Sequence, residues 1–357
     1  MDEKAPTIDI LEKFDDEEFQ KKRILIWVGG RANYGRLKML IDTLSQVHTV
    51  ELVVGDYEVP NRYVIAGRVP NLMYSDSFSN SARSLYIVVQ GVTTIIESRE
   101  PYDLAIVHAD RFENLGFAIA CSYCFIPLLH TEGGEESGQI DNKVRNAITS
   151  LADYHCAATE LAYKKLICRG YNAIFAGSPA IDYLREIDCS TCKRDYVLDY
   201  VLAVFNPSDT DDYTEFIAAI SNIAEVSLVF WIPPANDPGW REIAKDLHRL
   251  SNLFLMDKLS PSEYYYMLSR ARVLVGNTSS GIKEGCYLGI PYILVGDRQI
   301  GREVGPNVTK VPCKHRDIFN AVEDIQVGCR YEYNGMFGDG YSCEKILKYI
   351  DSEVFGG

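Results

Sequence analysis

A loop rich in acids and glycines is the densest group of ionisable residues in the sequence. Residues 130–141 contain four acids, of which Glu132 is the first and Asp141 the last, together with three glycines. Like charges that share a dry pocket raise at least one carboxyl pKa, so such a site can hold both an acid and a base. The loop therefore indicates acid–base chemistry. A calcium loop would need acids at alternate positions, which are missing, and a solvated acidic loop is the remaining alternative.

A second acid stands beside an arginine just after an apolar segment. Asp110 and Arg111 follow residues 104–108, which have the composition of a buried strand. Ligands of parallel α/β sheets bind at the carboxyl ends of the strands. This pair therefore suits a polar ligand, and a surface ion pair is the alternative.

Two segments carry basic residues at positions suited to an anion. A glycine turn at residues 29–30 leads through Arg31 and Tyr34 into a helical pattern, and helix N-termini of this kind bind phosphate through free backbone N–H groups. Arg298 and Arg302 follow another apolar segment. Each could instead be an exposed arginine on a turn or a solvated loop.

Hydroxyl side chains gather at a third strand–helix junction. Thr278, Ser279 and Ser280 join an apolar segment to a helical one, and Glu284 follows within the next turn. Hydroxyls and free amides at a helix start can hold a diphosphate, and a carboxylate nearby can accept from ribose hydroxyls. An ordinary helix cap is the alternative.

The segments around these residues predict two parallel α/β units. Short apolar runs alternate with helical spacing, which is typical of a parallel sheet covered on both faces. The strands are expected at 23–28, 50–54, 104–108, 126–130, 154–158, 200–205, 227–232, 253–256, 273–275 and 292–295. The helices are expected at 36–44, 84–98, 115–124, 143–151, 160–169, 212–223, 239–250, 260–271, 281–288 and 344–354.

The domain organisation follows from a break in this alternation. Residues 182–196 are polar and charged without an apolar period, so we place the junction there. We expect an N-terminal extension over 1–20, with a surface helix over 9–21 or a loose arm, a Rossmann-like domain over 21–182 and a second over 183–341. A closing helix at 342–355 is expected to pack back on the first domain. Two such halves place the ligand cleft between them.

The totals exclude several classes of protein. A chain of 357 residues suits about two domains, and a formal net charge of −14 disfavours a nucleic-acid partner. No apolar run approaches the roughly 18 residues of a membrane span, and the first residues lack the pattern of a signal peptide. We therefore expect a cytoplasmic protein with reduced thiols. The pairs Cys121/Cys124 and Cys189/Cys192 leave a metal or redox site as a minor alternative.

Taken together, these segments resemble the hydrolysing UDP-N-acetylglucosamine 2-epimerase family, which includes the enzymes of sialic-acid pathways. The resemblance runs from about residue 23 to 352. It rests on motifs that occur in this order: Arg31-Ala-Asn-Tyr34, His108-Ala-Asp-Arg-Phe112, Glu132-Gly-Gly-Glu135, Ser137-Gly-Gln-Ile-Asp141, Ala176-Gly-Ser-Pro-Ala-Ile-Asp182, Gly276-Asn-Thr-Ser-Ser-Gly281 and Gly296-Asp-Arg-Gln-Ile-Gly-Arg-Glu303.

The resemblance implies a GT-B fold, with two Rossmann-like domains that close over a UDP-sugar, no cofactor and no metal. It implies a homodimer or homotetramer. It assigns UDP or substrate binding to Arg31, Tyr34, Arg111, Thr278, Ser279, Ser280, Glu284 and Arg298, and catalysis to Asp110, Glu132 and Asp141. The implied reaction eliminates UDP and adds water, which converts UDP-N-acetylglucosamine to N-acetylmannosamine plus UDP.

Asparagine occupies several positions that are ionisable in the family: Asn33, Asn142, Asn146 and Asn206. Asn206 stands where the family has a catalytic histidine and is counted here with the catalytic set. Its amide can donate a hydrogen bond but cannot shuttle a proton near neutral pH. The chain is therefore either an epimerase with a rearranged acid–base set, a hydrolase or transferase of another nucleotide sugar, or a nucleotide-sugar-binding protein that has lost catalysis.

Overall fold

The computed structural model describes residues 20–55, 57–69, 78–138, 140–190, 199–208, 210–233, 239–250, 252–256 and 259–356, without the side chains of residues 78–79 and 188–190. The expected N-terminal extension lies outside the described residues except for Gln20, and so does Cys192. Within the described part of the chain, no helix is both long enough and apolar enough to cross a membrane.

The first domain is built on a parallel sheet with the strand order β3-β2-β1-β4-β5-β6-β7. Its strands are β1 Arg23–Val28, β2 Thr49–Val54, β3 Val64–Arg68, β4 Leu104–His108, β5 Leu128–Thr131, β6 Tyr154–Ala157 and β7 Asn172–Phe175. Its helices are α1 Arg31–Val47, α2 Phe78–Glu97, α3 Phe112–Tyr123, α4 Ile140–Leu151, α5 Glu160–Cys168 and α6 Pro179–Ser190.

Strand β1 shows why these runs are continuously apolar. Its side chains alternate between the two faces of the sheet, and helices cover both faces. Trp27 packs in one cluster with Phe117 of α3, with their ring centroids 5.9 Å apart. Ile26 packs in the other cluster with Leu37 of α1. Both faces are therefore dry, and the strand carries no polar alternation.

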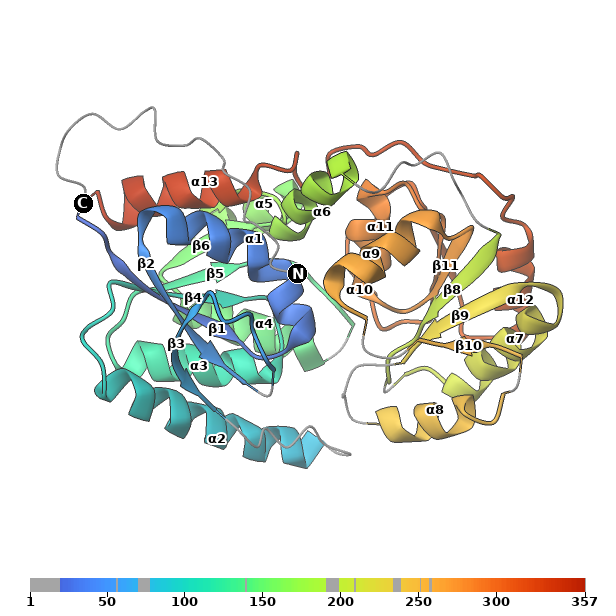
Figure 1. Ribbon diagram of the computed structural model, residues 1–357, viewed down its shortest axis with the longest axis horizontal. Coiled ribbons are helices and arrows are strands. Elements are labelled where there is room, and N and C mark those ends of the chain that lie inside the picture. The colour runs from blue at the N-terminus through green and yellow to red at the C-terminus, as the bar shows by residue number, and fades with distance from the viewer. Residues whose placement is uncertain are drawn as a thin grey trace.

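The second domain repeats the plan with the strand order β10-β9-β8-β11-β12-β13, again parallel. Its strands are β8 Tyr200–Val204, β9 Leu228–Ile232, β10 Phe254–Leu255, β11 Val273–Gly276, β12 Tyr292–Val295 and β13 Val308–Val311. Its helices are α7 Tyr213–Val226, α8 Trp240–Leu247, α9 Pro261–Arg270, α10 Ser279–Ile282, α11 Glu284–Tyr287 and α12 His315–Glu323. The prediction of two parallel α/β units is confirmed (Figure 1).

The chain ends on the first domain. Helix α13, Ser342–Tyr349, contacts α1 and α6 and leads into a π-helical turn, Ile350–Val354. The Asp182 carboxylate of α6 caps its start, because it accepts hydrogen bonds from the backbone N–H groups of Ser342 (3.0 Å) and Cys343 (2.7 Å). Figure 1 shows α13 returning across the top of the first lobe.

The structure corrects several expected elements. Residues 182–190 are not an irregular connector but the continuation of α6, whose apolar side is formed by Ala180, Ile181, Leu184 and Ile187 at helical spacing. The helix expected at 281–288 is two short helices that break at Lys283. The first helix begins at Arg31, earlier than expected. Strands β3, β7 and β13 and helix α12 were not predicted.

Candidate active site

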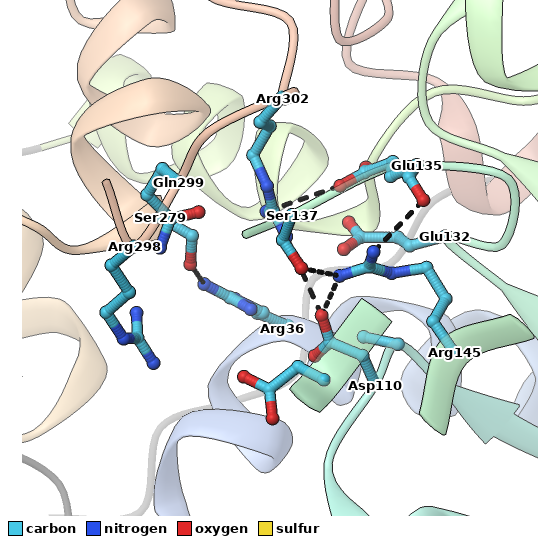
Figure 2. A pocket seen from close by; sticks show the side chains of 12 residues that line it. Arg36, Asp110, Glu132, Glu135, Ser137, Arg145, Ser279, Arg298, Gln299 and Arg302 are labelled. Carbon is cyan, nitrogen blue, oxygen red and sulfur yellow. Dashed lines mark hydrogen bonds and ion pairs between the residues drawn. The ribbon is translucent and has the colours of Figure 1, made fainter. Parts of the chain in front are cut away.

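Among the pockets between the domains, two neighbours share the side chain of Arg36. The first, with a volume of about 50 Å³, is lined by Arg36, Ala109, Asp110, Glu132, Glu135, Ser137, Asp141, Arg145, Ser279, Arg298, Gln299 and Arg302 (Figure 2). The second, of about 180 Å³, is lined by Arg31, Ala32, Gly35, Arg36, Val204, Ile232, Leu259, Ser260, Pro261, Tyr264, Tyr265, Thr278, Ser280 and Glu284. Both lie at the carboxyl ends of strands, where parallel sheets bind ligands.

Two left-handed residues shape the first pocket. Ala109 follows β4 with a φ of 63°, and Glu132 follows β5 with a φ of 61°. Such conformations cost a non-glycine residue roughly 1–3 kcal/mol and cluster at functional sites. The turn at Ala109 is held by His130, whose Nε2 lies 2.9 Å from the Ala109 carbonyl oxygen. The turn brings the next residue, Asp110, to the pocket wall.

Asp110 is held by buried guanidinium groups. Arg145 of α4 donates to its carboxylate, and Arg302 lies 3.6 Å from the same oxygen. Burial raises the pKa of Asp110, but the two arginines outweigh it and bring the pKa below its ordinary value. Arg145 also donates to the amide oxygen of Asn142 at 3.1 Å. The uncharged side chain of Asn142 thus still provides an oxygen that accepts a hydrogen bond from Arg145.

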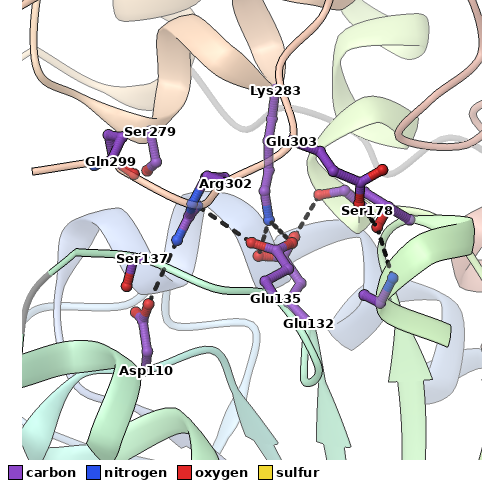
Figure 3. A network of polar contacts seen from close by, with 12 residues as sticks. Asp110, Glu132, Glu135, Ser137, Ser178, Ser279, Lys283, Gln299, Arg302 and Glu303 are labelled. Carbon is purple, nitrogen blue, oxygen red and sulfur yellow. Dashed lines mark hydrogen bonds and ion pairs between the residues drawn. The ribbon is translucent and has the colours of Figure 1, made fainter. Parts of the chain in front are cut away.

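Glu132 lies in a network that draws on both domains (Figure 3). Its carboxylate accepts a hydrogen bond from Ser178 at 2.6 Å and pairs with the ammonium of Lys283 at 2.6 Å. Burial opposes the charge, but Lys283, His108 and Arg36 hold the pKa of Glu132 well below its ordinary value. Glu132 is therefore an anion at neutral pH.

Behind Glu132 lies a buried, neutral histidine. Burial lowers the pKa of His108 to about 4. Its Nδ1 lies 2.9 Å from the Thr131 hydroxyl. Its Nε2 lies 3.7 Å from the Glu132 carboxylate and finds no hydrogen-bond partner among the described residues. Depending on its tautomer, the neutral imidazole presents at Nε2 either an N–H that can donate to the Glu132 carboxylate or a lone pair that can accept from the protonated carboxyl. The site is thus arranged for either protonation state of Glu132.

The second pocket combines a cation, hydroxyls and an unsatisfied carboxylate. Arg36 donates to the Ser279 hydroxyl at 2.8 Å and lies 3.6 Å from Glu284. Thr278 caps α10 by accepting from the Ser280 backbone N–H at 3.3 Å. Burial raises the pKa of Glu284, and within the described part of the chain its buried Oε2 has no hydrogen-bond partner. A ligand hydroxyl would satisfy that oxygen.

The structure gathers most of the predicted site residues at these pockets. Asp110, Glu132, Asp141, Ser279 and Arg298 line the first pocket. Arg31, Thr278, Ser280 and Glu284 line the second.

Three predicted residues lie outside both linings. Tyr34 packs against Tyr57, with ring centroids 5.6 Å apart. The Nε of Arg111 lies 2.6 Å from a Glu113 oxygen. Asn206 exchanges backbone hydrogen bonds with the side-chain amide of Asn277 at 2.7 and 2.8 Å.

Three residues that line the first pocket or bridge the domains were not singled out from the sequence: Arg36, Arg145 and Lys283. A usable signal existed for Arg145, which stands four residues after Asp141 and so faces the same side of α4. No such signal existed for Lys283, because its direction depends on the break between α10 and α11.

Among the described residues, no group of three or more His, Cys, Asp or Glu side chains could hold a metal ion. Cys121 is buried and Cys124 half-buried, and both are free thiols. The side chain of Cys189 and all of Cys192 lie outside the described residues.

The buried histidines make stability depend on pH. Burial lowers the pKa of His130 to about 3 and that of His108 to about 4, whereas an unfolded histidine titrates near about 6.5. Between these values the unfolded chain binds protons that the native protein does not. The free energy of unfolding is therefore expected to fall from pH 7 to pH 5, by roughly 2 kcal/mol for each histidine.

Urea unfolding of the wild type and of His130→Gln at pH 7 and pH 5 measures this effect. The variant is expected to lose less stability than the wild type over that interval. His315→Gln, at a half-exposed position, serves as the matched control and should keep the wild-type pH dependence. An equal loss in wild type and His130→Gln would contradict the assignment.

The sequence is similar to those of known proteins along most of its length. A family model described as UDP-N-acetylglucosamine 2-epimerase matches residues 58–351. A Legionella pneumophila protein named UDP-N,N'-diacetylbacillosamine 2-epimerase (hydrolyzing) is 28% identical over 363 residues, which cover 92% of this chain and 96% of the relative. A Neisseria meningitidis protein named UDP-N-acetylglucosamine 2-epimerase is also 28% identical over 363 residues, covering 93% of this chain and 95% of the relative.

Solved structures show the same fold. The UDP-GlcNAc 2-epimerase of Methanocaldococcus jannaschii, solved in complex with UDP-GlcNAc and UDP, superposes with a TM-score of 0.75 at 16% identity, over 92% of this chain and 99% of that one. The predicted GT-B architecture of two Rossmann-like domains is confirmed.

Proposed function

Because the chain belongs to the UDP-N-acetylglucosamine 2-epimerase family, we propose that it is a hydrolysing epimerase that converts UDP-N-acetylglucosamine to N-acetylmannosamine and UDP. One observation carries this proposal. Ionised carboxylates of the first domain, Asp110 and Glu132, share a pocket with the hydroxyl and arginine of the second, Ser279 and Arg298. That arrangement suits an anionic leaving group on one side and a carbon that becomes positively charged on the other.

The second pocket suits the nucleotide. The unsatisfied Oε2 of Glu284 would accept a hydrogen bond from a ribose hydroxyl. Arg31 and Arg36 border the same pocket, and guanidinium groups bind phosphate oxygens with two parallel hydrogen bonds. Arg298, from the neighbouring pocket, would complete the positive charge around the leaving diphosphate.

Breaking of the C1–O bond must lead the reaction, because the C2–H of an N-acetylhexosamine is a poor acid. UDP leaves with the electron pair of that bond, and positive charge develops at C1. Asp110, kept ionised by Arg145 and Arg302, would stabilise that charge. The charge acidifies C2–H, so the weakly basic Glu132 suffices to take the proton. The C2–H electron pair then forms the C1–C2 double bond of a glycal.

Addition of water completes the change at C2. Inversion requires that the new proton reach C2 from the face opposite to the one that lost it, so a second acid is needed. Asp141 is the remaining aspartate of the first pocket, and we assign this proton to it. The oxygen of a water molecule then bonds to C1, and the proton that this water releases returns to Asp141. The proton taken by Glu132 is lost to solvent, and N-acetylmannosamine is formed. No step requires a proton from Asn206.

Asn206→His is expected to retain turnover, and restoring the family's histidine could raise it. The contacts that tie Asn206 to Asn277 use its backbone N–H and carbonyl, so the substitution leaves them in place. Steady-state release of UDP from both proteins measures the effect. Asn206→Ala, which adds no proton carrier, is the control. Complete loss in the histidine variant would mean that the asparagine amide has a role of its own.

A product assay tests the proposed function directly. Incubation with UDP-N-acetylglucosamine should release UDP and N-acetylmannosamine, identified by sugar NMR. Release of N-acetylglucosamine would indicate a hydrolase. Absence of turnover, with UDP binding seen by calorimetry, would indicate a binding protein. UDP-N,N'-diacetylbacillosamine and GDP-sugars in the same panel would identify a shifted substrate.

A further inference from the structure

Lys283 is a buried cation that points out of its own domain. It stands at the break between α10 and α11, with φ −90° and ψ −70°. Its backbone keeps helical hydrogen bonds on both sides, since its N–H donates to Ser279 and its carbonyl accepts from Tyr287, each at 3.1 Å. The break therefore redirects the side chain without unwinding the segment. Figure 3 shows the side chain extending toward Glu132 and Glu135 of the first domain.

The ammonium of Lys283 pairs with two carboxylates across the domain boundary. Its Nζ lies 2.6 Å from a Glu132 oxygen and 2.5 Å from a Glu135 oxygen, and its side chain is 1% exposed. A buried ammonium is unfavourable unless it is paired and hydrogen-bonded. Both partners belong to the loop after β5. Lys283 can therefore hold this position only while the two domains are closed.

Among the contacts of the described residues, Lys283 is the cation of the second domain that pairs with Glu132. Arg302, another cation of the second domain, lies 3.3 Å from Glu135 and 3.6 Å from Asp110. The remaining groups around Glu132 are Ser178, neutral His108 and, at longer range, Arg36, all of the first domain. In the second domain, the negative charge of Glu132 contributes to raising the pKa of Glu284.

We propose that Lys283 is a positioning residue whose ammonium fixes the Glu132 carboxylate at the pocket only while the two domains are closed. This inference rests on the proposed function, in which Glu132 takes the C2 proton. Its consequence is that the base is assembled by domain closure. An open enzyme with a bound nucleotide sugar would lack the oriented base and would not expel UDP.

The test compares wild type, Lys283→Met and Lys283→Arg with UDP-N-acetylglucosamine between pH 5 and pH 9. Lys283→Met should lower kcat at pH 7 by about 10²-fold or more, with the dissociation constant of UDP changed by less than about threefold. Without the ammonium, Glu132 holds a proton more readily, so the acidic limb of the kcat profile, which lies below pH 5 in the wild type, should move up into the measured range. Lys283→Arg should return the limb toward its wild-type position.

Lys165→Met is the matched control. Lys165 pairs with Glu136 of the same loop at 2.9 Å and is partly exposed, so its removal should leave the acidic limb unmoved. Small-angle scattering adds a readout without turnover, in which ligand-free Lys283→Met should have a larger radius of gyration than wild type. If Lys283→Met does not fold, Lys283→Gln takes its place in the same measurements.

The outcomes separate two failures. An active wild type with an acidic limb that stays in place in Lys283→Met, or a loss that appears in KM alone, overturns the role of Lys283. An inactive wild type overturns the proposed function itself, and the inference with it.

Discussion

Glu132→Gln is expected to lower kcat by about 10³-fold, equivalent to about 4 kcal/mol of transition-state stabilisation. The amide oxygen of glutamine can still accept from Ser178, which donates to Glu132 at 2.6 Å, so the shape of the site is kept. What is lost is the ability to take the C2 proton, together with the negative charge that pairs with Lys283. Because the nucleotide pocket is lined by other residues, the dissociation constant of UDP should change by less than about threefold.

NMR analysis of products in reactions quenched at set times gives kcat, and calorimetry with UDP on the same preparation gives the dissociation constant. Glu136→Gln makes the same substitution in the same loop, at a half-exposed residue paired with Lys165. It should keep wild-type turnover. Equal losses of turnover and UDP affinity in Glu132→Gln would show that Glu132 contributes to ligand binding rather than to proton transfer.

Arg145→Met is expected to destabilise the protein by about 3 kcal/mol, because breaking a buried ion pair leaves the partner charge uncompensated. The Arg145 side chain is 1% exposed. Besides Asp110, its guanidinium satisfies the carbonyl of Glu135 and the amide oxygen of Asn142, at 3.0 and 3.1 Å. Turnover should also fall, by at least about 10²-fold, since Asp110 would no longer be held ionised and oriented.

A double-mutant cycle of Arg145→Met with Asp110→Asn measures how much of the lost stability and of the lost turnover comes from the interaction between the two residues. The double variant should recover part of the stability lost in Arg145→Met, because no unpaired charge remains, yet it should not recover activity. Denaturant midpoints give the stability and UDP release gives the rate. Lys164→Met, at an exposed pair with Glu160, should leave both unchanged. Strictly additive stability losses in the cycle would show that Asp110 and Arg145 do not interact.

The fold was predictable where strands are buried on both faces. Central strands such as β1 and β4 are continuous apolar runs, which alternation with helices makes recognisable. The strands that were missed, β3, β7 and β13, all lie at sheet edges. An edge strand faces solvent on part of its surface, as Val64 does at 57% exposure, so its sequence lacks that apolar signal.

The site was predictable to the extent that strand ends define it. Asp110 and Glu132 follow adjacent strands, and they meet because the carboxyl ends of parallel strands share one edge. Pairings between domains were not predictable, because they depend on closure. Nothing in the sequence near Lys283 or Arg302 indicates that these cations cross to Glu132, Glu135 and Asp110.

The hydrogen bonds from the start of α13 to the Asp182 carboxylate have a consequence for how the two domains are connected. The chain leaves the first domain after α6 and is returned to it at α13, where the carboxylate fixes the helix start. The chain therefore passes between the two halves twice, and its second crossing ends at a helix start that the Asp182 carboxylate fixes to the first half. Fixing α13 therefore keeps the second half next to the domain that carries Glu132 and Glu135, the two carboxylates that pair with Lys283.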